Sequence, residues 1–353
     1  MKHFLKLTIC IGSLIIFSCD GDDSSKPDQT NSSTILKSEN KVLRNQEIAF
    51  YDMDGNTDNT EYATFYVNDI AIEGNKFSSP TEGVFQIYSK YNLEGVLTTS
   101  QIDSFEVYIP RKKALIEGFT GTWCGNCPPL DFSVEKAQDS IKDLVIVMIH
   151  GGREYPGSQD PYTIPEGTIL GEFLEILGYP TGVIDRTFFW DYWRIPPLLP
   201  FPLYEIMPYA GLDTDISIAI NSELKNENLS VNVKIISEQV ISNSKLVVFL
   251  LEDGLLYDQV NYRNNDEWSP FYQMGNPIVD FEHNDVLRMS ITDPLGDVIP
   301  ETSALTEYNR DFNVNISSEF NTSNLKLVVT LLDENNLVRN TQQVPINQIQ
   351  DYE

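Results

Sequence analysis

Short stretches in which apolar and polar residues alternate make up much of the chain. Between residues 39 and 110 they fall at 47–51, 63–67, 83–88 and 104–108, separated by Gly, Asn, Asp and Pro. Alternation with a period of two is typical of strands that have one buried face. The pattern predicts a small immunoglobulin-like β-sandwich over residues 39–110.

The pattern changes after residue 111, where longer apolar runs alternate with stretches of helical spacing. The predicted elements are, in order, a strand at 114–119, a helix at 131–142, a strand at 144–149, a helix at 168–177 and a strand at 182–185. The run at 144–149 is almost wholly apolar, as in a strand buried on both faces. Strands that alternate with helices predict an α/β domain over residues 111–212.

Alternation returns from residue 213 to the end of the chain. The predicted strands include 216–220, 229–233, 245–250 and 325–331, with Asn and Asp at most of the breaks. They predict a second, larger β-sandwich over residues 213–353. The expected fold class is therefore multidomain, with an α/β domain between an N-terminal immunoglobulin-like sandwich and a C-terminal sandwich.

The N-terminus has the pattern of a secretory signal peptide over residues 1–18. A basic start precedes an apolar stretch at 7–17, which is too short to span a membrane, and Ser18 precedes Cys19. This ending resembles a relaxed lipobox, which implies that Cys19 is lipidated and anchors the protein to a membrane. The alternative is an ordinary signal peptide with a chance cysteine.

The stretch that follows, residues 19–38, is acidic, rich in Ser and Thr and nearly free of apolar residues at its start. It cannot bury enough surface to fold, so we predict a disordered linker. An acidic run behind a lipidated cysteine resembles the surface-export signal of some Gram-negative lipoproteins. The expected location is the cell envelope, on the outer membrane and facing outward.

The charge balance argues against one class of partner. The chain has 24 Lys and Arg against 52 Asp and Glu, a formal net charge of −28. Such a protein repels phosphate backbones, so nucleic acid is not an expected partner. The acidic loop at 52–58 suggests calcium, but Gly55 comes too early for an EF-hand loop, and a turn is the better interpretation. No cofactor or metal site is expected.

The cysteines point to one chemical site. Of the four, Cys10 lies in the signal peptide and Cys19 at the predicted lipidation site, which leaves Cys124 and Cys127 as a C-x-x-C pair. In an oxidising envelope this pair can rest as a disulfide. A single C-x-x-C lacks the second pair of ligands that structural zinc requires.

The residues around this pair carry a resemblance to known families. Trp123-Cys124-Gly125-Asn126-Cys127-Pro128 at a strand-to-helix junction, with a distant Gly178-Tyr179-Pro180-Thr181, resembles the thioredoxin-like superfamily. The phrases at 116–121, 179–186 and 282–288 resemble the Omp28-related outer-membrane lipoproteins. The resemblance implies a thioredoxin-like core, a cis proline beside the cysteines, and an outer-membrane location with adhesin or receptor roles.

The thioredoxin resemblance also implies a chemical role for each residue of the site. Cys124 would attack a disulfide, Cys127 would resolve the mixed disulfide, and Trp123, Tyr179, Pro180 and Thr181 would bind the substrate. The activity would be that of a thiol–disulfide oxidoreductase on protein or peptide substrates. The alternative is a non-catalytic surface binding protein or adhesin in which the disulfide is structural, and the sequence leaves open whether the protein is an enzyme.

Three features depart from the thioredoxin pattern. Pro128 and Pro129 predict that the helix starts later or kinks. Gly118 stands where thioredoxins carry a proton-accepting carboxylate, and Glu117 would face the other side of the strand. The surrounding acidity should discourage a thiolate, because nearby like charges disfavour the charged form.

Other residues are candidates for accessory roles at the site. Glu117 and His150 are possible accessory residues, since His150 ends a buried strand on the side expected for Cys124. A loop-anchoring role is the alternative for His150, and His283 is predicted to be structural. The aromatic stretch at 188–197 predicts either an exposed binding loop near the cysteines or packing against a neighbouring domain.

Overall fold

The computed structural model describes residues 32–151, 159–192 and 203–353. The predicted signal peptide, Cys19 and most of the predicted linker lie outside these residues. Of the described residues, 47% are in strands and 11% in helices. None of the helices in this part of the chain is long and apolar enough to cross a membrane.

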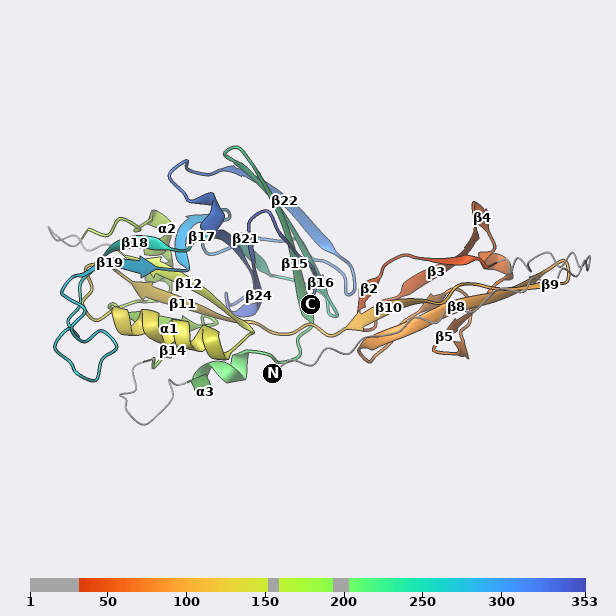
Figure 1. Ribbon diagram of the computed structural model, residues 1–353, viewed down its shortest axis with the longest axis horizontal. Helices are drawn as coiled ribbons and strands as arrows, with labels where there is room; N and C mark the ends of the chain where they lie inside the picture. Colours follow the sequence, from red (N-terminus) through yellow and green to blue (C-terminus); the bar gives the residue numbers. More distant parts are fainter. Residues whose placement is uncertain (1–31, 152–158, 193–202) are drawn as a thin grey trace, which may run out of the picture.

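The N-terminal part forms two sheets that pack face to face around Phe50, Phe65 and Phe105. The first sheet contains β1 (Thr34–Lys37), β3 (Ile48–Asp54), β4 (Thr57–Asp58) and β7 (Lys76–Phe77). The second contains β2 (Lys41–Leu43), β5 (Thr64–Val67), β6 (Ile70–Ala71), β8 (Gly83–Leu93), β9 (Val96–Thr99) and β10 (Asp103–Tyr108). Strand β1 begins inside the segment predicted as linker. These sheets form an elongated lobe to one side of the molecule (Figure 1).

A nine-stranded sheet forms the centre of the remaining chain. Its order is β14-β13-β11-β12-β20-β17-β23-β24, and β21 pairs with β17. The strands are β11 (Ala114–Thr120), β12 (Leu144–His150), β13 (Thr181–Ile184), β14 (Phe188–Trp190), β17 (Lys245–Glu252), β20 (Val286–Ser290), β21 (Asp297–Val298), β23 (Leu325–Leu332) and β24 (Val338–Pro345). Strands β11 and β12 are parallel and fully buried, which explains their continuous apolar runs.

Helices and a second sheet cover the two faces of this sheet. Helix α1 (Pro128–Ser140) packs on the face that carries Ile116 and Ile146, and α2 (Pro165–Phe173) on the opposite face, beside Leu115 and Val147. On the same face as α1, a four-stranded sheet packs against β17 and β23 of the central sheet. Its strands are β15 (Ile216–Lys225), β16 (Asn228–Ser237), β22 (Tyr308–Asn315) and β25 (Ile349–Gln350). The hairpin of β18 (Leu255–Gln259) and β19 (Ile278–His283) and the short α3 (Leu203–Ile206) complete the strands and α-helices of the described residues, which also include three short 3-10 helices.

The predicted fold class is wrong in its α/β part. The described chain is mostly β-sheet, and no separate α/β thioredoxin-like domain stands between two sandwiches. Strand β12 pairs in parallel with β20 at Met148 and Val286, so the strands from residues 114–190 continue into β17, β23 and β24. The sequence could not show this, because the joining pair is far apart along the chain and leaves no local pattern.

Candidate functional site

The cysteine pair lies where β11 ends and α1 begins. Cys124 and Cys127 form a disulfide with their Cα atoms 5.4 Å apart. Cys124 is 5% exposed, and Cys127 is fully buried. Cys124 is therefore the more accessible residue of the pair.

Helix α1 begins directly after the second cysteine. Cys127 has right-handed helical backbone angles and Pro128 is the first helical residue, so the prediction of a later start is wrong. Proline suits the first turn of a helix, where its missing N–H would have no intrahelical partner. Pro128 and Pro129 nevertheless remove two of the amides that could stabilise a thiolate, and the next amide, of Leu130, donates to the carbonyl of Cys127 at 2.8 Å. The N-terminus of α1 therefore stabilises a thiolate less than the N-terminus of a helix without these prolines would.

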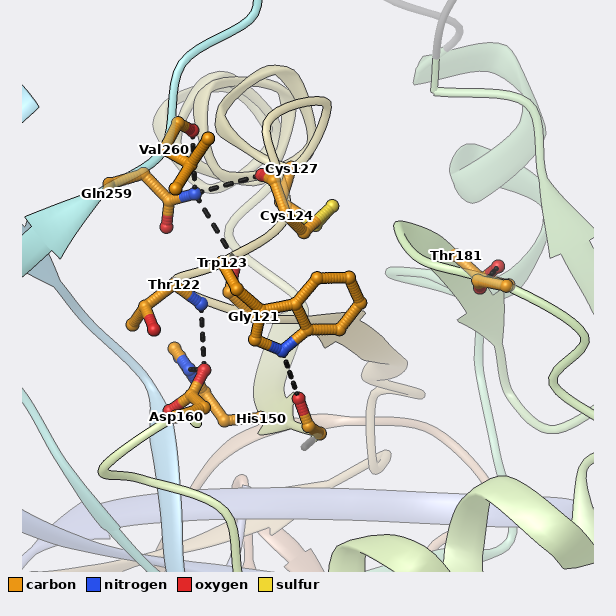
Figure 2. Close-up of a disulfide and its surroundings, with 12 residues drawn as sticks. Gly121, Thr122, Trp123, Cys124, Cys127, His150, Asp160, Thr181, Gln259 and Val260 are labelled. Carbon is orange, nitrogen blue, oxygen red and sulfur yellow. Dashed lines mark hydrogen bonds and ion pairs between the residues drawn. A yellow bond between two sulfur atoms is a disulfide. The ribbon is translucent and has the colours of Figure 1, made fainter. Parts of the chain in front are cut away.

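A segment that follows β18 crosses the cysteine loop. The amide of Val260 donates to Thr122 O, and the amide of Tyr262 to Gly125 O, both at 2.8 Å. Gln259 Nε2 donates to Cys124 O at 3.0 Å and to Gly121 O at 3.3 Å, as Figure 2 shows. The Tyr262 ring lies against Gly125, where a β-carbon would clash with it. Sequence reasoning missed this segment, because nothing near Gln259 indicates a contact 135 residues away.

The predicted substrate-binding residues lie on the other side of the cysteines. Trp123 Nε1 donates to Gly151 O at 2.7 Å, and its ring meets that of Tyr179 edge to face at 5.6 Å. The Tyr179–Pro180 peptide bond is cis. In Figure 2 the visible end of the disulfide points toward the side on which Thr181 lies. The structure thus brings Trp123, Tyr179, Pro180 and Thr181 to one side of the disulfide.

His150 is tied to the cysteine loop through an acid that the sequence analysis did not single out. His150 Nδ1 lies 2.8 Å from Asp160 Oδ2, which also accepts the amide of Thr122 at 2.7 Å. Burial by itself would raise the pKa of Asp160, but the hydrogen bonds from His150, Thr122 and Tyr162 hold it below its usual value. Both side chains are inaccessible, so the pair anchors the loop ahead of Trp123.

His283 completes this buried cluster from β19. Its ring lies 5.2 Å from the ring of His150 and 5.6 Å from that of Tyr162. Burial, together with the neighbouring His150, lowers the pKa of His283 to about 4, so it is neutral at physiological pH. The cluster joins β12 to the β18–β19 hairpin, which in turn leads into the segment that crosses the cysteines.

Glu117 does not lie among the groups around the disulfide. It forms a fully buried ion pair with Arg186, with Nη2 to Oε1 at 2.8 Å. At Gly118 a β-carbon would lie 2.6 Å from Met148 Sδ and 3.5 Å from Leu130, so these side chains fill the space where a carboxylate would project beneath α1. Neither residue supplies a proton acceptor for Cys127.

The residues of the aromatic stretch at 188–197 differ in their exposure. Phe188 and Phe189 are exposed on β14, whereas Trp190 is buried against Gly182, and residues 193–197 lie outside the described residues. The larger group of exposed aromatic residues lies after β18, with Tyr262, Trp268 and Tyr272. The sequence analysis did not single out these residues, since they fall in a region without periodicity.

Comparison with known proteins identifies the chain. A family described as outer membrane protein Omp28 matches residues 170–350, which is more than half of the chain. The chain belongs to the Omp28 outer membrane protein family. This Omp28 family member is therefore an outer-membrane protein of the cell envelope, as its sequence predicted. The match includes the cis proline and the segment that crosses the cysteines, and it begins after the cysteines themselves.

Solved structures show a likeness in fold. The Omp28 family member is similar to HBP35 of Porphyromonas gingivalis, with 16% identity and a TM-score of 0.51, over 67% of this chain and 76% of that chain. Protein AGR_C_4864 from Agrobacterium tumefaciens matches at 11% identity and a TM-score of 0.38, over 69% of this chain and 97% of that chain. A comparison with curated proteins gives no match.

Proposed function

We propose that this outer-membrane protein exchanges disulfides with cysteine pairs of protein or peptide substrates, with Cys124 as the reacting sulfur and Cys127 as the resolving one. The observation that carries the proposal is the asymmetry of the pair, since Cys124 keeps 5% exposure and Cys127 has none. A disulfide in which one cysteine is more accessible than the other suits attack at the sulfur of the more accessible one. In Figure 2 Trp123 lies beside the cysteine pair, and Thr181 lies farther away.

The proposed reaction needs no group beyond the two cysteine pairs. From the reduced form, the Cys124 thiolate attacks a substrate disulfide, and one substrate sulfur leaves as a thiolate. The Cys127 thiolate then attacks Cys124 in the mixed disulfide, which releases the second substrate sulfur and forms the Cys124–Cys127 bond. Two electrons pass to the substrate, and the two protons lost by Cys124 and Cys127 balance those taken up by its thiols. The reverse sequence oxidises a substrate dithiol.

The anchor is a second part of the proposal. Lipidation at Cys19 would hold the protein on the outer membrane, and the polar stretch between Cys19 and the buried Ser33 would act as a tether. The polar composition of this stretch supports a tether, because it has few apolar side chains to bury. The cysteine pair would then meet substrates at the membrane surface.

Replacing Cys127 with Ser is expected to trap mixed disulfides on Cys124. Without Cys127 the second step cannot occur, so adducts should accumulate when the reduced variant meets a model disulfide such as oxidised glutathione or a disulfide-bonded peptide. Mass spectrometry of the intact protein measures the adduct. The matched control is Cys124→Ser, whose remaining Cys127 is fully buried and should give at most about a tenth as much adduct in the same time. Equal or no trapping by the two variants contradicts the proposal.

The reduction potential of the pair separates exchange from a structural role. If the pair exchanges disulfides with substrates, its reduction potential should lie within about −270 to −120 mV, the range of known exchange catalysts. It is measured by equilibrating the protein with glutathione buffers and alkylating the free thiols. A value below about −300 mV marks a disulfide that resists reduction and points to a structural pair.

A surface-binding role is the second candidate, and one observation favours it. Tyr262 and Trp268, on the segment between β18 and β19, are 66% and 70% exposed, and Met274 is 50% exposed. Aromatic side chains held outward on a fixed loop are typical of binding surfaces. The loop is held by Asn261, whose side-chain nitrogen donates to Phe271 O and Gly275 O. Loss of ligand binding in Trp268→Ala, with binding kept in the cysteine variants, would support this role.

A further inference from the structure

A groove runs along α1, beside the β18–β19 hairpin. One wall of the groove is α1, and the other is formed by β19 and the residues on either side of it. Figure 1 shows α1 and β19 at the end of the molecule away from the N-terminal lobe. Its volume is about 370 Å³. The residues that line it are Asp131, Phe132, Val134, Glu135, Gln138, Met148, Phe271, Phe281, Glu282, Asn284 and Asp285.

Asp131 is the unusual member of this lining. It follows Cys127 by one helical turn, and its Oδ2 is buried and has no hydrogen-bond partner among the described residues. The other contact of this carboxyl group is a hydrogen bond from the backbone amide of Asp131 itself. A buried carboxylate oxygen without a partner is costly, since it has lost its water and gained nothing in exchange. Burial accordingly raises the pKa of Asp131 to about 8. Such a group gains most from a ligand that brings a positive charge.

The rest of the lining combines negative charge with aromatic walls. Glu135, Glu282 and Asp285 add carboxylates, while Asp285 is already held by Gln138 and Lys326. Phe132 and Phe271 meet edge to face at 6.2 Å, and Phe281 continues the wall. None of the described residues that line the groove is basic. Lys136 lies 5.6 Å from the Phe132 ring, but it is not part of the lining and it pairs with Glu135 and Asp139.

We propose that this groove binds an ammonium or guanidinium group on an apolar stem, as in a lysine or arginine side chain of a protein partner. Carboxylates receive the charge, and phenylalanine rings accept both the stem and the cation. The carboxylates extend from the first to the third turn of α1 and across to β19, which suits an elongated organic cation. This binding goes beyond disulfide exchange and does not depend on it.

The test titrates the full chain, oxidised and in about 0.15 M salt to screen non-specific attraction. The probe is a fluorescein-labelled heptapeptide of alternating lysine and glycine, followed by anisotropy. A counterpart with norleucine keeps the stems and removes the charges. The lysine peptide is expected to bind at least about tenfold more tightly than the norleucine peptide, the difference of one charge-assisted hydrogen bond.

Variants separate the groove from the general acidity of the chain. Asp131→Asn is expected to weaken binding of the lysine peptide about tenfold, and Glu282→Gln to weaken it as a second, independent lining change. The matched control is Asp139→Asn, which removes one charge from the exposed side of the same helix and should leave binding unchanged. Equal losses in Asp131→Asn and Asp139→Asn would overturn the proposal, because only net charge would then matter.

Two competitors identify the kind of ligand. Displacement of the peptide by equimolar calcium would overturn the proposal in favour of a metal site. Cadaverine carries the same ammonium groups on a free apolar stem. If cadaverine binds at least about tenfold more weakly than the peptide, the natural ligand is a polypeptide, and equal affinity assigns the same chemistry to a free amine.

Discussion

Replacing Glu117 with Gln should destabilise the protein by about 3–5 kcal/mol, because it leaves the Arg186 guanidinium buried without its counter-charge. Glu117 and Arg186 side chains are 0% and 1% exposed. Arg186 Nε and Nη2 donate to the Glu117 carboxylate, while Nη1 has no partner among the described residues. An arginine cannot escape by losing its proton, so the whole cost falls on folding.

The loss is measured as the shift of the urea unfolding midpoint. The matched control is Glu223→Gln, which breaks an exposed pair with Lys225 and should leave the midpoint unchanged. The double change Glu117→Leu with Arg186→Met should regain most of the loss, since apolar residues of similar volume replace a buried pair well. If the single and double variants unfold at the same midpoint, the charge left behind is not the cause.

The ion pair also supports the candidate site. Glu117 lies in the middle of β11, which leads into the cysteine loop, and Arg186 follows β13, which begins at Thr181. These two strands pair antiparallel from Ile116–Ile184 to Phe119–Thr181. The pair therefore holds together the two elements that present the disulfide and the residues across from it.

Much of the secondary structure could be predicted from local sequence patterns. The run at 245–250 predicted β17, and the alternation at 229–233 predicted β16; both strands are confirmed and extend a few residues further. The helix predicted at 131–142 is α1, which starts at Pro128 because proline fits the first turn. These features depend on neighbours in the sequence, which is why they could be predicted.

Pairing between distant segments could not be predicted in the same way. The parallel pairing of Met148 with Val286 joins the two halves of the central sheet. Met148 falls in a predicted buried strand, but nothing in the local sequence indicates Val286 as its partner. The predicted thioredoxin-like domain was wrong for this reason. The strands from residues 114–190 were expected to close their own sheet, whereas β20 extends it.

At the candidate site, too, residues in short motifs could be predicted, whereas residues that reach the site from distant parts of the chain could not. The sequence indicated the C-x-x-C pair, Trp123 and the proline at 180, because each belongs to a short motif. Asp160 and Gln259 bind the cysteine loop from 38 and 135 residues away and belong to no motif. Asp131 lay inside a helical pattern as one more polar residue, and only the packing of α1 shows that its Oδ2 is buried.

Replacing Asp131 with Asn should stabilise the protein, by an amount that grows as the pH rises from about 4 to 8. Burial raises the pKa of Asp131 to about 8 in the folded state, well above the value of about 3.9 in an unfolded chain. The unfolded state then binds fewer protons than the folded state between these two values, so the wild type loses stability as the pH rises, by at most about 1.4 kcal/mol per pH unit. Asn does not titrate, so the stability of the Asp131→Asn variant does not have this pH dependence.

Unfolding free energies of the two proteins, measured in urea at pH 5, 6, 7 and 8, test this expectation. Other titrating groups are common to both proteins and cancel in the difference, which should be small at pH 5 and reach a few kcal/mol at pH 8. Asp139→Asn, on the exposed side of α1, should show no such slope. A difference that is the same at every pH would mean that the Asp131 carboxylate ionises as readily in the folded chain as in water.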